Sequence, residues 1–436
     1  MTAPSKLLNR NFVLLWQGQA VSQLGTQISA TAMLFWLKHV TGSPGLMGSV
    51  AMVAGLCAAV LGPIGGAFAD RYSRRSIMII CDLVSGSAVL CLALLIWLTR
   101  TGGFSLGGVV AVSIVVAAAN SFFQPAISAS TADLVPKEKV AGANSTLQAS
   151  LRLATLVGLS IGGVLFRILG APLALTIDGI TYLISAFSKY FIAIPQTFKA
   201  SSPGWGNRSK EVFSQIGEGL NYVRSNRGLT QLLIVATIFN LFMAPILGLF
   251  PFYVEDCLKL PSDWYGYLLA AYGVGALSGY LLAGTLKTLR RARAAWLLSF
   301  LVAASALYGA LGLFRSSAVI GAIIFTIGAL SSFINVSIIT VLQIATPSQI
   351  RGRVFGLLTT ITACLQPVGM GMAGAGASLA GKNIGIIYVL CGCCMAIVTL
   401  VAASLRDIRE YLSIGREEAA QVSLQPSEAT ESAAAR

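Results

Sequence analysis

Residues 65–76 read GGAFADRYSRRS, and this stretch places one carboxylate and three arginines between Asp70 and Arg75. Apolar sequence flanks it on both sides, over residues 46–69 and 77–98. A helix of about 20 apolar residues spans the hydrocarbon core of a bilayer. The flanks therefore predict two membrane-spanning helices, and the charged stretch predicts a turn at the membrane surface.

The same pattern extends along the whole chain. Of its 436 residues, 56% are hydrophobic and 11% are charged, whereas a soluble domain carries about 25% charged residues. Long uncharged stretches predict an all-α membrane protein with twelve transmembrane helices, and their continuity excludes an alternating barrel pattern. The expected spans are 11–37, 45–69, 76–98, 107–130, 143–169, 171–194, 229–254, 264–286, 294–314, 318–342, 354–380 and 383–405.

The formal net charge of +14 is distributed as a topology signal and does not indicate nucleic-acid binding. An even number of spans places both termini on one side, together with the Asp70–Arg75 turn. That side holds most of the 30 lysines and arginines, so the positive-inside rule makes it cytoplasmic. The opposite loops carry one basic residue each: Lys38, Arg100, Arg167, Lys259, Arg315 and Lys382.

The longest expected cytoplasmic loop divides the spans six and six. We expect an N-terminal half over 1–194, a linker over 195–228 with a surface amphipathic helix at Glu211–Val223, a C-terminal half over 229–412, and a disordered cytoplasmic tail over 413–436. The halves also resemble each other in where their polar residues lie. Repeated halves in a membrane protein indicate a transporter whose site lies between them.

Gly66-Ala-Phe-Ala-Asp70-Arg71-Tyr-Ser-Arg74-Arg75, between the second and third spans, resembles the signature loop of the major facilitator superfamily. Ser22-Gln-Leu-Gly25, Phe123-Gln-Pro-Ala126 and Arg351-Gly-Arg-Val354 resemble a bacterial exporter branch that includes the enterobactin exporter and macrolide efflux proteins. The resemblance implies two pseudo-symmetric six-helix halves working by alternating access in the bacterial cytoplasmic membrane. It also implies that Asp70 latches a cytoplasmic gate, with Arg71, Arg74 and Arg75 reaching neighbouring helices.

The chain departs from the branch pattern in places that bear on energy coupling. Thr26 stands where the branch often has Asp, and Leu159 where a proline usually follows the first glycine of the antiporter signature. The span 107–130 holds no charged residue, so it lacks the membrane-embedded arginine of many drug–proton antiporters.

Ionisable residues inside spans are functional candidates, because each costs at least about 2.5–3.5 kcal/mol at the bilayer centre. Arg152 and Asp178 lie in neighbouring spans and can approach each other, either as a buried ion pair or as a proton or substrate site. Asp178 is the first candidate for a proton carrier, and Asp82 is the second. We expect Lys189 to reach the cytoplasmic surface by snorkelling, and His39 to lie at the outer surface.

Uncharged amides inside the spans are candidates for a substrate cavity. Each could instead form an interhelical hydrogen bond worth about 0.6 kcal/mol, but as a set, beside several aromatic residues, they suit a bulky neutral or amphipathic molecule. The candidates are Gln19, Gln23, Gln27, Asn120, Gln124, Asn240, Asn335, Gln343 and Gln366.

These observations predict a monomeric secondary transporter that exports a hydrophobic or amphipathic small molecule, such as a drug or siderophore, by proton antiport. A nutrient importer or a lipid flippase of the same fold is the alternative within transport, and a membrane scaffold or signalling protein is the alternative outside it. We expect no enzymatic activity and no cofactor beyond the proton gradient. Cys391-Gly-Cys393-Cys394 lies in an uncharged span without nearby histidine, which favours helix packing over a metal site.

Overall fold

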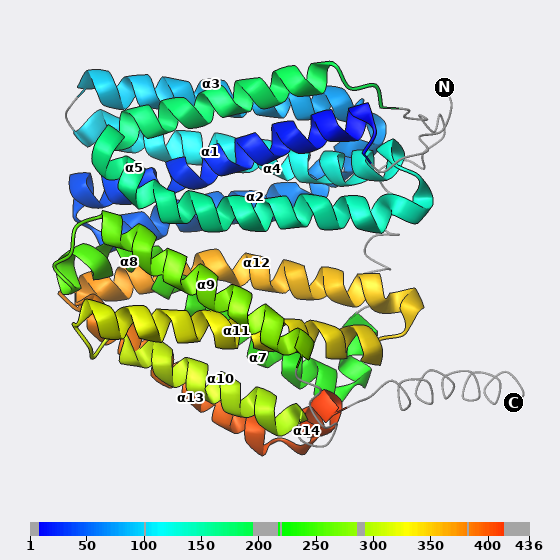
Figure 1. Cartoon of the computed structure of the whole chain (residues 1–436), viewed down its shortest axis with the longest axis vertical. Coiled ribbons are helices and arrows are strands. Elements are labelled where there is room, and N and C mark those ends of the chain that lie inside the picture. Colours follow the sequence, from blue (N-terminus) through cyan, green and yellow to red (C-terminus); the bar gives the residue numbers. More distant parts are fainter. Residues whose placement is uncertain are drawn as a thin grey trace, which may run out of the picture. The chain divides into compact units, whose positions relative to one another are not determined.

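The computed structural model of the chain describes residues 8–99, 102–194, 217–218, 220–285, 293–381 and 383–413. Every regular element in these ranges is helical (Figure 1). The first helices are α1 (Arg10–Thr41), α2 (Pro44–Arg71), α3 (Arg74–Thr99), α4 (Gly102–Leu134), the 3-10 turn η1 (Lys137–Lys139) and α5 (Val140–Tyr190). The later ones are α7 (Arg227–Gly248), α8 (Phe250–Phe252), the π-helical turn η2 (Tyr253–Cys257), α9 (Asp263–Thr285), α10 (Arg293–Ala310), α11 (Ser317–Ala345), α12 (Ser348–Leu379), α13 (Ile384–Ser404) and α14 (Arg406–Ser413).

Local sequence signals set the boundary between α1 and α2. The Asn9 side chain accepts a hydrogen bond from the backbone N–H of Phe12 and caps α1 at its start. Gly42 ends α1 in the left-handed conformation, with φ of 54°, which glycine adopts without steric cost. Ser43 caps α2, and Pro44 occupies its first turn, where a missing N–H costs nothing.

The spans predicted at 143–169 and 171–194 correspond to the single element α5, which is 51 residues long. Gly170 interrupts it with φ of 74° and ψ of 175°, and Pro172 follows. An L-residue with a side chain rarely adopts this φ, so the kink depends on glycine. The two predicted spans are thus joined by a kink instead of a loop.

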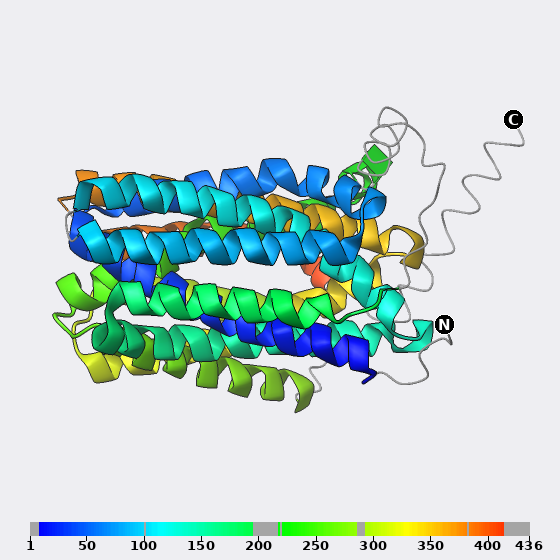
Figure 2. The ribbon, with the colours of Figure 1, turned by 90° about the horizontal axis from the view of Figure 1, so that it is seen from above.

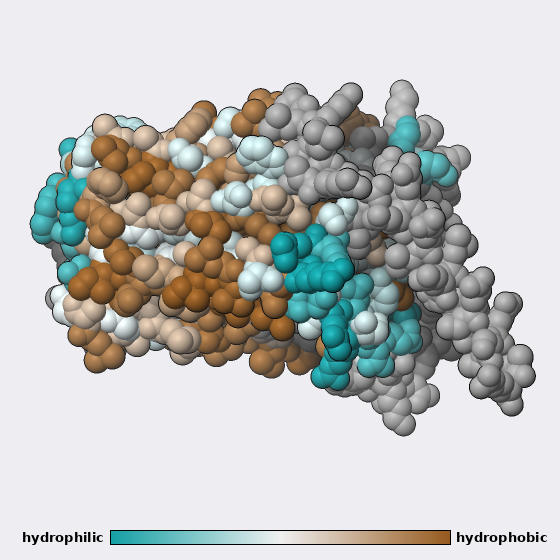
Figure 3. Space-filling view, turned by 90° about the horizontal axis from the view of Figure 1, so that it is seen from below, coloured by the Kyte–Doolittle hydropathy of each residue, from teal (hydrophilic) through white to brown (hydrophobic). Residues whose placement is uncertain are grey.

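Eight helical stretches in the described residues are long and apolar enough to cross a membrane, and the α5 stretch of 49 residues has the length of two crossings. Both α1 and α12, with 32 residues each, are also long enough, but glutamine, serine and threonine lower their hydropathy. The count of twelve remains a prediction from sequence. On the face drawn in Figure 3, apolar residues cover the middle of the helices and polar residues gather toward their ends.

The chain forms two compact units. The first comprises residues 1–200, 247–270 and 367–384, and the second comprises 201–246, 271–366 and 385–436. In the first unit α5 packs along α1 and α3, α3 also packs on α4, and α4 packs on α2 (Figures 1 and 2). The units do not follow the order of the chain, because two segments from its second part pack with the first five helices.

Each unit has an apolar core at its helix contacts. In the first unit Leu15, Met78 and Phe123 belong to one buried cluster contributed by α1, α3 and α4. In the second unit α14 buries Ile408, Tyr411 and Leu412 against residues of α7, α10 and α11. The predicted tail beyond Ser413 and most of the predicted helix at Glu211–Val223 lie outside the described residues, and the predicted domain limits stay a prediction.

Candidate functional site

The charged turn between α2 and α3 is tied to two other helices of the first unit. Arg74 forms an ion pair with Asp133 at the end of α4 and donates from Nε to the carbonyl of Ala69 at 3.2 Å. Arg75 donates to the Tyr190 carbonyl at the end of α5, and its guanidinium carbon lies 5.2 Å from the centre of the Tyr190 ring. Arg71 is exposed, and the side chain of Asp70 lies outside the described set. Arg74 and Arg75 thus reach neighbouring helices within the first unit, and the predicted reach of Arg71 stays a prediction.

Asp82 of α3 and Lys189 of α5 form a buried ion pair. The Lys189 Nζ lies 2.6 Å from Asp82 Oδ2 and 2.5 Å from Ser185 Oγ, and it faces the Phe123 ring at 4.6 Å. Lys189 is completely buried. The expectation that it snorkels to the surface is therefore wrong: a buried ammonium is tolerated here because a carboxylate and a hydroxyl satisfy it.

Asp178 of α5 is 2% exposed, faces hydroxyl groups of α1, and forms no ion pair with the residues that the structure describes. Ser29 donates to its Oδ2 at 2.5 Å, and Thr26 Oγ1 lies 3.2 Å from its Oδ1. The Tyr182 hydroxyl lies 3.1 Å from Thr26 Oγ1. The side chains of Asp178, Ser29, Thr26 and Tyr182 thus form one hydrogen-bonded group, the Asp178 group.

The predicted approach of Arg152 to Asp178 is wrong. Arg152 is exposed on α5 and forms no ion pair with Asp178, although both residues are described. Counting residues from the end of the span gives the depth of Arg152, but it does not give the side of the helix on which the side chain lies. Among the described residues, Arg152 consequently makes no ion pair that supports a role in proton coupling.

A close approach of α1 to α5 brings the hydroxyls to Asp178. A Cβ added to Gly25 would lie 2.3 Å from Thr181 Oγ1 and 3.1 Å from Asp178 Oδ1. The absence of a side chain at Gly25 therefore permits the helix spacing on which the Asp178 group depends.

Two adjoining cavities lie in the first unit, with volumes of about 370 Å³ and 170 Å³. Gln19, Gln23, Gln124 and Leu151 line both of them. The larger is also lined by Ile127, Ser128, Asn144, Leu147 and Gln148. The smaller includes Thr26, Gln27, Asp82, Asn120, Phe123 and Tyr182 among its lining residues. All five predicted cavity residues of α1 and α4 thus line a cavity, and the smaller one adjoins both Asp82 and the Asp178 group.

Two amide oxygens in these walls lack hydrogen-bond partners. Within the described residues, the Oε1 atoms of Gln19 and Gln23 are buried and unpaired. Leaving a buried acceptor unsatisfied costs about 1–3 kcal/mol. A ligand that donates hydrogen bonds to these oxygens would recover that cost.

The other predicted cavity residues belong to the second unit. Asn240 is half-buried and donates to the carbonyl of Ala236 at 2.8 Å. Asn335, Gln343 and Gln366 are exposed. Their predicted role in a cavity stays a prediction.

Sequence reasoning missed several residues of the site. Asn144 and Gln148 line the larger cavity from the start of α5, and their four-residue spacing is the signal that had identified the glutamines of α1. Ser29 and Tyr182 carried no comparable signal, because hydroxyl residues are common in membrane helices and become relevant only beside a carboxylate.

A helical membrane protein with amide-lined cavities and buried ionisable groups in or beside them has the features of a solute transporter. The Major Facilitator Superfamily matches residues 15–370, and the chain belongs to this family of transporters, which are not enzymes. Macrolide efflux protein A of Streptococcus pyogenes is 25% identical over 413 residues, covering 92% of this chain and 96% of the relative. Multidrug efflux pump Tap of Mycobacterium tuberculosis is 27% identical over 395 residues, covering 88% and 91%.

Solved structures share the fold. A bacterial homologue of the iron transporter ferroportin, in an inward-facing state, has a TM-score of 0.67 at 14% identity and covers 91% of this chain and 100% of that one. The nucleoside transporter NupG has a TM-score of 0.66 at 12% identity, covering 90% and 98%. At these identities the likeness concerns the fold alone.

Proposed function

We propose that this secondary transporter exports a hydrophobic or amphipathic small molecule in exchange for protons across the bacterial cytoplasmic membrane. The observation that carries the proposal is a pair of adjoining amide-lined cavities. The smaller one is also lined by Thr26 and Tyr182, which belong to the hydrogen-bonded group of Asp178, a buried carboxylate with no ion pair among the described residues. The efflux proteins among the relatives support export of a drug-like molecule.

The cavity lining favours a neutral or amphipathic substrate over an anion. A sugar phosphate or other small anion requires clustered arginine or lysine, whereas the larger cavity is lined by amides, one serine and aliphatic side chains. The unpaired oxygens of Gln19 and Gln23 favour a substrate with hydroxyl or amine donors.

Asp178 is better suited than Asp82 to carry the coupling proton. Asp82 and Asp178 are the buried carboxylates of the described residues. An unpaired buried charge is costly, so Asp178 suits the neutral acid when its site is closed to water, while Lys189 balances Asp82 in place. Thr26 and Tyr182 connect Asp178 to the smaller cavity, where water or a proton can enter.

The proton gradient is sufficient for this work. One charge that moves through 100 mV releases about 2.3 kcal/mol, and tenfold in concentration corresponds to about 1.4 kcal/mol. A single proton per cycle therefore supports a substrate gradient of roughly fiftyfold.

Transport of a macrolide and of a fluorescent cationic dye into inverted membrane vesicles tests the proposal. We expect accumulation when the vesicle interior is made acidic, and a loss of at least about tenfold with Asp178→Asn. Adding Thr26→Asp to Asp178→Asn is expected to restore part of the activity, because Thr26 Oγ1 lies 3.2 Å from Asp178 Oδ1.

Two outcomes contradict parts of the proposal. Normal accumulation by Asp178→Asn would show that Asp178 is only structural. Accumulation by right-side-out vesicles, when the external side is acidic, would show import.

A further inference from the structure

The carboxylate of Asp82 differs from every other group in the walls of the two cavities. Among the described residues that line them, Asp82 carries the one formal charge. Lys189 neutralises this carboxylate at 2.6 Å, but Lys189 is not one of the lining residues. The smaller cavity therefore has an anionic group in its wall, and the counter-ion of that group belongs to the protein and lies outside the wall.

Burial makes the ammonium of Lys189 a permanent counter-ion. Lys189 is completely buried, and Asp82 is 3% exposed. Ser185 Oγ, one turn before Lys189 on α5, lies 2.5 Å from the ammonium nitrogen, and the Phe123 ring faces it at 4.6 Å. Removing one partner of a buried pair leaves an uncompensated charge, which is strongly destabilising. The pair is therefore held together in the folded protein.

Close packing of α3 on α5 keeps the two partners side by side. A Cβ added to Gly86 of α3 would lie 3.1 Å from the carbonyl oxygen of Gly179 on α5, and a Cβ added to Gly179 would lie 3.1 Å from the carbonyl oxygen of Gly86. Glycine at both positions lets the two backbones approach. Because Gly86 lies one turn after Asp82, this contact limits how far α3 can carry Asp82 away from Lys189.

We propose that Lys189 determines the charge preference of the cavities: it occupies the carboxylate that would otherwise attract a cationic substrate, so a neutral molecule is preferred over a cation of the same shape. A carboxylate in a poorly hydrated wall attracts a cation much more strongly than it does in water. With Lys189 in place the pair is neutral as a whole, and a substrate cation has to compete with a tethered ammonium.

The inference rests on the proposed function in one respect, which is that the cavities hold the transported molecule. It does not depend on the direction of transport or on the coupling role of Asp178. Binding without a proton gradient therefore tests it.

Two probes of equal shape and different charge measure the preference. One is a dansyl sulfonamide that carries a trimethylammonium group on a two-carbon arm, and the other carries a tert-butyl group in its place. Both keep a sulfonamide N–H that can donate to the unpaired oxygens of Gln19 and Gln23. We would measure their affinities for the purified protein in detergent, by equilibrium dialysis against protein-free micelles. Damage to the fold weakens both probes, whereas the ratio of their affinities reports the charge preference.

We expect the parent to bind the tert-butyl probe at least as tightly as the trimethylammonium probe. Lys189→Met should shift the affinity ratio toward the cation by about tenfold or more, because close charge pairs in a desolvated site couple strongly. Asp82→Asn should shift the ratio in the opposite direction, since it leaves the ammonium of Lys189 without its carboxylate. The double variant, Asp82→Asn with Lys189→Met, removes both charges and should stay within about twofold of the parent ratio.

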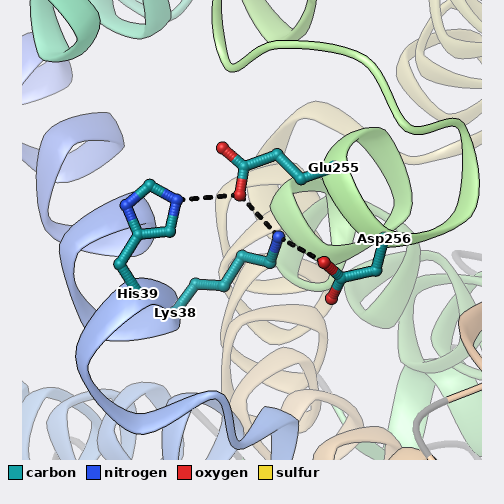
Figure 4. Close-up of polar contacts among 4 residues, drawn as sticks. All are labelled: Lys38, His39, Glu255 and Asp256. Carbon is teal, nitrogen blue, oxygen red and sulfur yellow. Dashed lines mark hydrogen bonds and ion pairs between the residues drawn. The ribbon is translucent and has the colours of Figure 1, made fainter.

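Lys38 provides a matched control for the loss of a buried ammonium. Its side chain is 5% exposed and forms ion pairs with Glu255 and Asp256 of η2 (Figure 4). None of these three residues lines either cavity. Lys38→Met thus breaks a buried ion cluster away from the cavities, and it should leave the affinity ratio within about twofold of the parent even where it lowers stability.

An unchanged ratio in both Lys189→Met and Asp82→Asn, at parent levels of folded protein, would overturn the inference. A parent that prefers the cation by about tenfold or more would also overturn it. If the single variants fold poorly, the parent and the double variant carry the test, and a double variant that moves about tenfold toward the cation would exclude Asp82 as the cause.

A lack of binding of both probes to the parent and to every variant would overturn the inference as well. Accumulation of the macrolide by inverted vesicles would then still decide the proposed export, so the failure of one is distinguishable from the failure of the other.

Discussion

Asp178 and Asp82 are buried carboxylates of the same half of the chain, and they differ in what balances their charge. An ammonium group faces Asp82, and hydroxyl groups face Asp178. Loss of a proton from Asp178 therefore creates a charge that the described protein does not compensate. This asymmetry is why the proposed coupling role belongs to Asp178, while Asp82 and Lys189 form a fixed pair beside the smaller cavity.

The carboxylate of Glu255 in η2 lies in an ion cluster with Lys38 and His39 of α1 (Figure 4). Burial raises the pKa of Glu255, but hydrogen bonds from His39 and Lys38 and their positive charges outweigh burial, and the pKa is lowered overall. Asp256 lies beside it on η2, Phe166 of α5 contributes an uncharged ring, and a protonated His39 adds positive charge. A carboxylate with a lowered pKa stabilises the folded protein above its ordinary pKa, and this contribution is lost as the pH falls through the lowered value.

We therefore expect the thermal unfolding midpoint of the parent in detergent to exceed that of the Glu255→Gln variant above about pH 4.3, the ordinary glutamate pKa. The two midpoints should converge below that pH. Equal midpoints at pH 7 would contradict the assignment to Glu255.

The sequence predicts how deep a residue lies in a membrane span, but it does not predict the direction in which the side chain points from the helix. The distance of Arg152 or Lys189 from the end of a span follows from counting residues. Which side of a helix meets a partner depends on where the neighbouring helix packs. A span that is apolar on all sides carries no sequence signal for that packing. For that reason the sequence does not reveal that Lys189 turns inward to Asp82, or that Arg152 lies on an exposed side of α5.

At the scale of elements, small residues set how closely the helices of the first unit approach. A Cβ added to Gly266 of α9 would lie 1.8 Å from the carbonyl oxygen of Ser160 on α5. A Cβ added to Gly163 would lie 2.7 Å from the carbonyl oxygen of Ser262. The contact is made by backbone on both sides, so no side-chain rotation can relieve a clash.

We expect Gly266→Ala to lower the free energy of unfolding by about 1–3 kcal/mol, the usual cost of overpacking. Gly321 of α11 is a matched control, because a Cβ added there meets no atom within 4 Å. Gly321→Ala should be neutral or stabilise its helix by up to about 1 kcal/mol. Thermal unfolding in detergent would measure both, and equal midpoints for the two variants would refute the close contact.

At the scale of the whole molecule, we predict two separable roles for the charged turn after α2. Lysine and arginine determine orientation in the membrane, and aspartate contributes little to it. Arg74 and Arg75 also bind the ends of α4 and α5. Membrane topology therefore explains why arginines occupy this turn, but it does not explain the aspartate. The family resemblance implies that Asp70 latches a cytoplasmic gate.

We predict that Asp70→Asn inserts in the normal orientation and transports poorly, with a loss of about tenfold or more. Insertion would be measured by the accessibility of engineered surface cysteines, and transport by dye accumulation in inverted vesicles. Glu138→Gln, which removes an exposed carboxylate of η1, is the control and should transport normally. Near-normal transport by Asp70→Asn would reduce the turn to a topological anchor.

Composition, charge-free stretches and the Asp70–Arg75 turn were enough to identify a polytopic helical transporter and its family, because a bilayer constrains hydropathy and loop charge directly. The glutamines of α1 were also identifiable as cavity residues, since a four-residue spacing places side chains on one helix face. The fold was needed to show that Asp82 pairs with Lys189, that hydroxyls surround Asp178, and that Lys38 meets Glu255. These contacts join residues more than 100 positions apart, and their partners depend on how the helices turn and pack, for which uniformly apolar spans carry no signal.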